Sequence, residues 1–387
     1  MRNVQWILGA SFLLAACSGG SDTDTPTLTP GDSATPTAAD STPTAAGNGT
    51  PTAAGNDTPT EAGNATPTAA SDGVVAVDPS KFLSAGLATG TTITEEACTL
   101  SGGTETTCYR IVTKSQPTDH SMGPFCPPNI SSDASEGGIW AQDDVIHDVD
   151  GAFIANLPVF YSDDNWQLYD SDTGDVYVTD SYDACEGAAK PDVEEQYQNH
   201  CVECDASYID DEAVMAFVIP KNPVYQDTPE EAGQENLGVA FNGVEFAQAA
   251  PVEAILAAYT IAPFDDCGGH VNLHNGYHYH RATGCSTEET SAGDHAPMIG
   301  YALDGFGIYA LEDGSGNEPT DLDECRGHTD ASLGYHYHVA GPDEPYFIGC
   351  FHGEIGCSLS FESGVDSECS ADGGGPPGGG PPGKAVK

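Results

Sequence analysis

One histidine-rich segment occurs twice, and this duplication constrains the fold more than any other feature of the 387-residue chain. The first copy, residues 264–280, is FDDCGGHVNLHNGYHYH, and the second, residues 322–338, is LDECRGHTDASLGYHYH. The copies align without gaps, nine of the seventeen positions are identical, and a Gly-Cys pair follows each, at 284–285 and 349–350. Each copy is therefore predicted to be one disulfide-closed unit with three histidines at a fixed spacing.

The Tyr-His-Tyr-His ending of each copy predicts a β-strand with two different faces. Successive side chains of a strand point to opposite sides, so the two histidines share one face and the tyrosines share the other. The tyrosines are expected to pack in the core. The disulfide-bounded loop can bring a third histidine back to each pair. The candidate metal ligands are His270, His278, His280, His328, His336 and His338. Asp265 and Asp323 are candidates for a further ligand, or for the acceptor that fixes a histidine tautomer.

Neutral imidazole is a suitable ligand for transition metals, so the expected cofactor is a Cu, Zn, Fe, Mn or Ni ion. The alternative is that these histidines are merely solvated on an exposed strand. The duplication argues against this alternative, as does the clustering of nine of the twelve histidines between His270 and His352. Whether the two triads form one centre or two stays open at this stage.

Two features between the copies carry further predictions. Asp304-Gly305 separates two apolar runs and predicts a two-residue type I′ hairpin, with Asp304 as a turn residue rather than a ligand. Residues 313–324 place oxygen side chains as an EF-hand loop does, and calcium is the alternative cofactor there, although Glu318 replaces the required glycine. The oxygen side chains belong to Asp313, Ser315, Asn317, Asp321 and Glu324.

These motifs resemble those of the YHYH-domain proteins, whose name describes residues 277–280 and 335–338. The segments IGYALDGFGIYA (299–310), LDECRGH (322–328) and PYFIGCFHG (345–353) are similar to that family, and VIPKNP (218–223) and LGVAFNGVEF (237–246) are similar more loosely. The resemblance extends over about residues 97–357 and departs from the family at Gly307, where proline is expected. It implies a secreted or surface domain and no particular chemistry.

The cysteines indicate an oxidising compartment. Apart from Cys17 there are twelve, an even number, and disulfides persist outside the cytoplasm. Spacing suggests the pairs Cys98–Cys108, Cys267–Cys285, Cys325–Cys350 and Cys357–Cys369, and leaves the partners of Cys126, Cys185, Cys201 and Cys204 open. Cys201 and Cys204 form a CxxC pair, for which a redox or zinc role is the less favoured alternative.

The ends of the chain predict export and anchoring. Residues 1–16 have the pattern of a lipoprotein signal peptide, and Leu-Ala-Ala-Cys at 14–17 predicts acylation of Cys17. Residues 17–73 repeat Thr, Pro, Ala and Gly and are predicted to be a disordered linker, as is the Gly/Pro-rich tail 370–387. The net charge of −50 disfavours nucleic acid as a partner. The expected location is the bacterial cell envelope, with the membrane as a partner through the lipid anchor.

The remaining residues, 74–369, are predicted to form a mainly β domain with minor helix, built sheet on sheet and stabilised by disulfides. It would have an N-terminal part (74–250) and a histidine-rich part (251–369). Strands are expected at 151–162, 175–182, 213–220, 237–246, 298–303 and 306–311, and a helix at 251–261. The favoured function is transition-metal binding by a tethered lipoprotein. The alternatives are a metal-dependent extracellular oxidoreductase or hydrolase, and an envelope adhesion domain with structural histidines.

Overall fold

The computed structural model describes residues 74–142, 145–209, 214–232, 236–249, 252–285, 295–342, 344, 346–361 and 364–369. The expected signal peptide, Cys17, the linker and the tail lie outside these residues. Within them the chain is rich in strands and has little helix, which confirms the predicted fold class. No helix of the described part is both long and apolar enough to cross a bilayer.

The largest sheet contains both histidine motifs. Its strand order is β13-β14-β12-β11-β7-β8-β10-β9. The strands are β7 (Gly238–Ala240), β8 (Glu245–Phe246), β9 (Gly269–Asn272), β10 (Gly276–Tyr279), β11 (Met298–Ala302), β12 (Gly307–Tyr309), β13 (Gly327–Asp330) and β14 (Gly334–His338). One histidine hairpin, β9–β10, lies at one edge, and the other, β13–β14, lies at the opposite edge.

The sheet repeats one four-strand pattern about its centre. In each half a hairpin, β7–β8 or β11–β12, adds a histidine hairpin through a parallel pair, β8 with β10 or β12 with β14. The halves join where β7 pairs antiparallel with β11. The duplication therefore includes residues 237–246 and 299–308, in which only Gly238/Gly300, Ala240/Ala302 and Gly243/Gly305 are identical.

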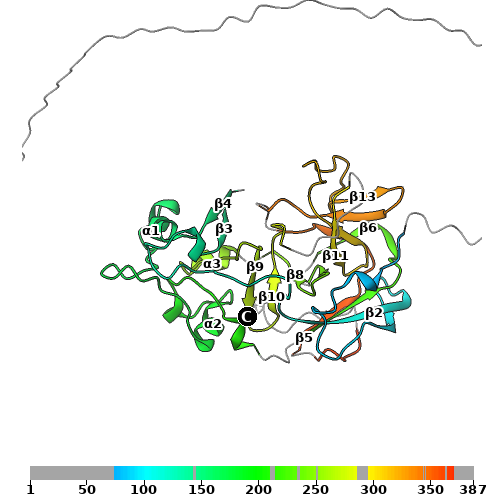
Figure 1. Cartoon of the computed structure of the whole chain (residues 1–387), viewed down its shortest axis with the longest axis horizontal. Helices are drawn as coiled ribbons and strands as arrows, with labels where there is room; N and C mark the ends of the chain where they lie inside the picture. The colour runs from blue at the N-terminus through cyan, green and yellow to red at the C-terminus, as the bar shows by residue number, and fades with distance from the viewer. Residues whose placement is uncertain are drawn as a thin grey trace, which may run out of the picture. The chain divides into compact units, whose positions relative to one another are not determined.

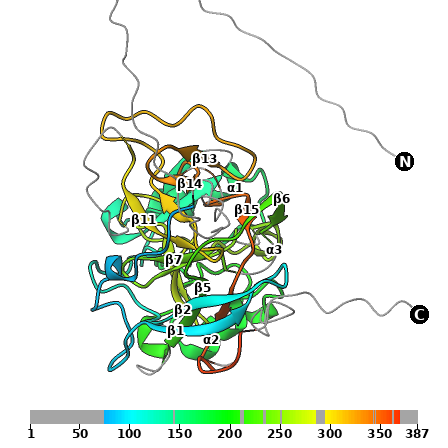
Figure 2. The ribbon, with the colours of Figure 1, turned by 90° about the vertical axis from the view of Figure 1, so that its right-hand side faces the viewer.

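A second, antiparallel sheet packs against the first. Its order is β1-β2-β5-β16, with β1 (Thr94–Thr99), β2 (Glu105–Lys114), β5 (Val214–Pro220) and β16 (Cys357–Leu359). Ile111 and Phe217 of this sheet belong to the same buried cluster as Val239, Phe246 and Tyr301 of the large sheet. The shared apolar core is the expected packing of sheet on sheet. In Figure 2, β13 and β14 lie at the top and β1, β2 and β5 below.

The remaining elements are short. Two-stranded sheets are formed by β3 (Ile139–Gln142) with β4 (Val145–Asp148), and by β6 (Tyr225–Glu231) with β15 (Cys350–Gly353). The α-helices are α1 (Gly151–Phe160), α2 (Tyr182–Ala188) and α3 (Val252–Ala257), and single 3₁₀ turns cover Pro79–Lys81, Ala134–Glu136, Glu195–Tyr197 and Ala206–Tyr208. In Figure 1, α1, α2 and α3 lie to the left of β9 and β10, and β2 and β5 lie to the right.

Two predicted strands are wrong, and the predicted helix at 251–261 is confirmed in a shorter form as α3. Residues 151–160 form helix α1, because Asp150 accepts a hydrogen bond from the Phe153 amide as an N-cap and Ile154 and Leu157 are buried at helical spacing. The uniformly apolar run concealed this period. Residues 175–181 make only isolated bridges, at Asp175, Val176 and Val178, and α2 begins at Tyr182.

The hairpin at Asp304-Gly305 occurs where it was expected, but the predicted turn type is wrong. The Ala302 carbonyl accepts a hydrogen bond from the Gly305 amide, and only Gly305 has a positive φ, of 83°. A type I′ turn needs positive φ at both central residues. The loop is instead a three-residue turn that ends in a left-handed glycine, and Gly243 repeats it with φ of 88° in the first half.

Six disulfides crosslink the domain. The four pairs suggested by spacing are present, at Cys98–Cys108, Cys267–Cys285, Cys325–Cys350 and Cys357–Cys369. The other two join Cys126 to Cys201 and Cys185 to Cys204. Cys201 and Cys204 thus have different partners, which removes the redox and zinc interpretations of the CxxC pair. Such crosslinking is typical of proteins outside the cytoplasm.

Candidate metal centres

The third histidine of each motif reaches the other two by strand pairing. In the β9–β10 hairpin His270 lies directly opposite His278, and in β13–β14 His328 lies directly opposite His336. His280 and His338 follow two residues later, on the same face of their strands. The two triads form separate groups at opposite edges of the sheet. We call His270, His278 and His280 centre A, and His295, His328, His336 and His338 centre B.

Centre B brings four imidazoles together. The Nε2 atom of His336 lies 3.0 Å from the Nε2 atom of His295 and 3.0 Å from that of His328. One nitrogen from each of the four rings lies within 4.8 Å of the others. His338 is fully buried, and its Nε2 has no hydrogen-bond partner among the described residues. The centre is therefore lined by ring nitrogens that face one another.

The other ring nitrogen of each histidine in centre B is held by an oxygen atom. Carbonyl and carboxylate oxygens accept hydrogen bonds and do not donate them, so Nδ1 of each ring carries the hydrogen. In a neutral imidazole Nε2 then has no hydrogen and presents a lone pair to the centre. The Nδ1–oxygen distances are 2.9 Å to the Ala296 carbonyl from His295, 2.9 Å to the Asp321 carboxylate from His328, 2.9 Å to the Gly334 carbonyl from His336 and 2.8 Å to the Ala310 carbonyl from His338.

Centre A repeats this arrangement with three rings. Nδ1 of His278 donates to the Gly276 carbonyl at 2.9 Å, and Nδ1 of His280 donates to the Gln248 carbonyl at 2.5 Å. The ring centroids of the triad are 4.8 to 4.9 Å apart, and one nitrogen from each ring lies within 4.8 Å of the others. Equivalent backbone carbonyls thus select the same tautomer for His278 and His336, and for His280 and His338.

Burial keeps five of the histidine rings neutral. Desolvation lowers the pKa of His278 and of His336 to about 4 and that of His338 to about 3. Desolvation and the neighbouring imidazoles lower the pKa of His270 and His280 well below the usual value. At neutral pH these five rings offer lone pairs rather than charges, which is the state that binds a metal ion.

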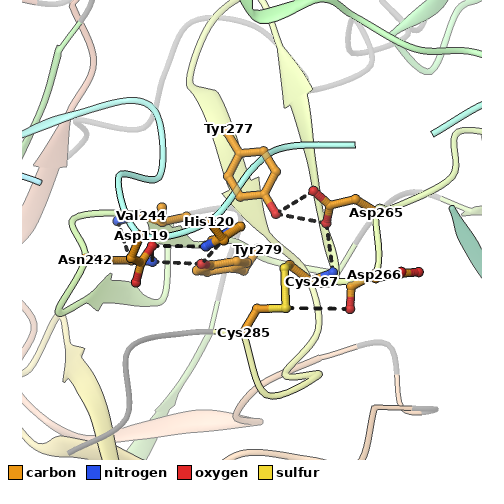
Figure 3. Close-up of polar contacts among 10 residues, drawn as sticks. All are labelled: Asp119, His120, Asn242, Val244, Asp265, Asp266, Cys267, Tyr277, Tyr279 and Cys285. Carbon is orange, nitrogen blue, oxygen red and sulfur yellow. Dashed lines mark hydrogen bonds and ion pairs between the residues drawn. A yellow bond between two sulfur atoms is a disulfide. The ribbon is translucent and has the colours of Figure 1, made fainter. Parts of the chain in front are cut away.

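The tyrosines occupy the opposite face, as the alternation predicted, and they are buried. Figure 3 shows the first copy, in which the Tyr277 hydroxyl donates to Asp265 at 2.9 Å and Asn242 donates to the Tyr279 hydroxyl at 2.8 Å. Asp265 also accepts hydrogen bonds from the backbone amides of Cys267 and Gly269. Its carboxylate therefore fixes a tyrosine and a turn, and it neither belongs to centre A nor sets a histidine tautomer.

The second copy differs from the first at one of these polar positions. Asp323 is equivalent to Asp265 and accepts from the Tyr335 hydroxyl at 2.8 Å, so it too is not part of a histidine centre. Asp304 stands where the first copy has Asn242, and its carboxylate accepts from the Tyr337 hydroxyl at 2.6 Å. It also accepts from two backbone amides, one of them that of Gly353, and burial raises its pKa to about 6. Asp304 is therefore a buried acceptor for several donors, which goes beyond a turn role.

The residues proposed for calcium do not converge. The Asp313 carboxylate accepts from the amides of Ser315 and Asn317, whereas Asp321 pairs with His328. A further group, Asp323, Cys325 and His352, is close enough for a metal, but Cys325 is in a disulfide and oxidised sulfur is a poor ligand. Within the described ranges, the two histidine centres are thus the groups able to hold an ion.

Two residues near the centres were not predicted from the sequence. His295, which precedes β11, completes centre B. Glu245 of β8 lies beside His278 in the parallel β8–β10 pair and is 2% exposed. Burial raises the pKa of its carboxyl to about 8, although the nearby Asn275 amide opposes this shift. The sequence did contain a signal for Glu245, since it is a charged residue inside the apolar run 237–246. The equivalent position of the second half is Gly307, so the duplication did not draw attention to it.

A comparison with known protein families gives a match to part of the chain. Residues 216–320 match the model of a family described as YHYH protein. The chain contains a YHYH-family domain. The match begins in β5, covers the whole of centre A and ends before β13, so the second YHYH motif lies beyond it. No curated protein and no solved structure matches the chain.

Proposed function

We propose that this YHYH protein binds transition-metal ions at centres A and B. The observation that carries the proposal is the 3.0 Å separation of the His336 Nε2 atom from those of both His295 and His328. Three lone pairs this close repel one another unless a cation lies between them. A metal ion about 2.0–2.1 Å from each nitrogen would satisfy this spacing.

The donor set favours particular ions. Both centres offer neutral imidazole, which suits Zn, Cu, Ni or Fe, whereas Ca²⁺ and Mg²⁺ require oxygen ligands. The backbone carbonyls and the Asp321 carboxylate that accept Nδ1–H bonds orient the rings they hold and increase their basicity, as the outer partners of metal-bound histidines do.

Metal content tests the proposal. The full chain, produced without an affinity histidine tag, should contain about two ions by elemental analysis after exposure to Zn²⁺ and desalting. The His278→Ala/His280→Ala and His336→Ala/His338→Ala variants should each contain about one. His274→Ala removes an exposed histidine of the β9–β10 turn and should leave the content unchanged. A parent protein without stoichiometric metal would refute the assignment.

We also propose that the protein is held at the cell envelope by lipid on Cys17. Small residues before a single cysteine support this, as does a polar segment long enough to separate the domain from the membrane. Cys17→Ser should move the protein from the membrane fraction to the soluble fraction. An unchanged distribution would contradict the anchor without affecting the metal centres.

A further inference from the structure

The two centres differ in what surrounds them, although their hairpins are equivalent. Centre A lacks a fourth histidine, cysteine or carboxylate within reach among the described residues, whereas His295 supplies one to centre B. On the neighbouring strand, Glu245 pairs with His278, and by the same register Gly307 lies beside His336. The duplicated frame therefore encloses two different environments.

Centre B is filled by side chains. The Tyr309 ring packs 4.6 Å from the His336 ring and 4.9 Å from the His295 ring, centroid to centroid. A Cβ atom on Gly307 would lie 2.8 Å from Met298 and 2.9 Å from Tyr309, so there is no space there for another side chain. These contacts fill the side of centre B that faces Gly307 and Tyr309.

Centre A instead faces a cavity of about 410 Å³. The three imidazoles line it, and Ala247 lines it at the position equivalent to Tyr309. A methyl group thus stands where centre B has a phenol ring. The volume is in the range of sites for small molecules.

The cavity wall carries polar atoms that the protein itself does not use. Both carboxyl oxygens of Glu245, the Nε2 atom of Gln248 and the Oδ1 atom of Asn275 are buried and have no hydrogen-bond partner within 3.5 Å among the described residues. The Asn275 amide interacts with the Glu245 carboxyl without forming such a bond. All three side chains line the cavity of centre A. Buried polar groups are nearly always paired, so three unpaired groups around one cavity indicate a missing partner.

We propose that centre A keeps one coordination position open to this cavity and binds a small ligand there. The ligand coordinates the metal through an oxygen or nitrogen atom and exchanges hydrogen bonds with Glu245, Gln248 and Asn275. Centre B is closed and takes no external ligand. This inference rests on the proposed metal binding and assigns the exchangeable chemistry to one of the two centres.

Co²⁺ and azide test the inference, because the visible spectrum of Co²⁺ reports a change of ligands. The His336→Ala/His338→Ala variant isolates centre A, and the His278→Ala/His280→Ala variant isolates centre B. Azide should change the spectrum of Co²⁺ in centre A, with saturation, and leave that of centre B unchanged. Equal responses at both centres, or no response at centre A, would overturn the inference. If centre A takes up no Co²⁺ at all, it is the proposed metal binding that fails.

Two substitutions in the centre A background sharpen the test. Ala247→Tyr introduces the residue that closes centre B and should retain Co²⁺ while abolishing the azide response. Glu245→Leu removes a hydrogen-bonding partner and should retain Co²⁺ while weakening azide binding about tenfold, or about 1.4 kcal/mol. Unchanged azide affinity in Glu245→Leu would exclude a role for the carboxyl. Loss of Co²⁺ from that variant would make Glu245 a metal ligand and contradict an open position.

Discussion

Replacing His338 by phenylalanine should separate metal binding at centre B from stability. In the metal-free protein the buried Nε2 atom of His338 has no hydrogen-bond partner in the described part of the chain, and such an atom costs about 1–3 kcal/mol. Phenylalanine removes this cost but also leaves the Ala310 carbonyl without the Nδ1–H donor, at about 1 kcal/mol. The two effects nearly cancel, so the metal-free variant should be within about 1–2 kcal/mol of its parent.

The response to metal should change far more. Zn²⁺ at about 100 times its dissociation constant stabilises a protein with one site by about 2.7 kcal/mol. We would measure the free energy of unfolding in guanidinium, with and without a chelator, in a His278→Ala/His280→Ala background that leaves only centre B. The parent should gain about 2.7 kcal/mol from Zn²⁺, and His338→Phe almost nothing.

His147→Phe serves as the control, because His147 lies on β4 outside both centres. It should keep the full stabilisation by Zn²⁺. If His338→Phe gains as much from Zn²⁺ as its parent, His338 is not a ligand and the metal binds elsewhere than in centre B.

Three further predictions follow from the same contacts. Burial lowers the pKa of His336 to about 4 and that of His338 to about 3, whereas both have a pKa near 6.5 in the unfolded chain. Between about pH 6.5 and pH 4 the unfolded chain therefore binds more protons than the folded protein. The metal-free protein should lose stability as the pH falls through this range. Denaturation midpoints measured in the presence of a chelator at pH 7.5 and pH 5 check this. The His336→Ala/His338→Ala variant should show a smaller decrease in stability between these pH values than its parent. Asp304→Asn places an amide donor against the Gly353 amide and should cost about 1–3 kcal/mol in thermal or chemical unfolding. Replacing both cysteines of the Cys267–Cys285 bridge by serine should cost about 3 kcal/mol and weaken metal binding at centre A but not at centre B, as titration of each isolated centre would show.

Much of the candidate site was predictable from local pattern. Alternation in Tyr-His-Tyr-His places the two histidines on one face whatever the rest of the fold does, and the β-rich class follows from the apolar runs between turns. The third histidine of each triad was expected from a closed loop. In the structure it arrives by direct cross-strand pairing within the hairpin.

The parts that could not be predicted depend on contacts between distant segments. His295 is a single histidine before a strand, and only the packing of β11 and β12 beside β14 brings it to His336. Apart from the Asp321 carboxylate at His328, the acceptors that set the tautomers are backbone carbonyls, which carry no signal in the sequence. Asp265 and Asp323 seemed suited to that task, but the turn that holds each of them directs the carboxylate to the tyrosine face.

The antiparallel seam between β7 and β11 protects a strand edge within a single chain. A protein with only one of the two halves would expose that strand as an unpaired edge, and such an edge pairs readily with another copy of itself. Because both halves belong to one polypeptide, the edge is covered without a second subunit, and the two halves need not carry the same side chains. One half has Tyr309 beside its histidines, and the other has Ala247 and the buried Glu245.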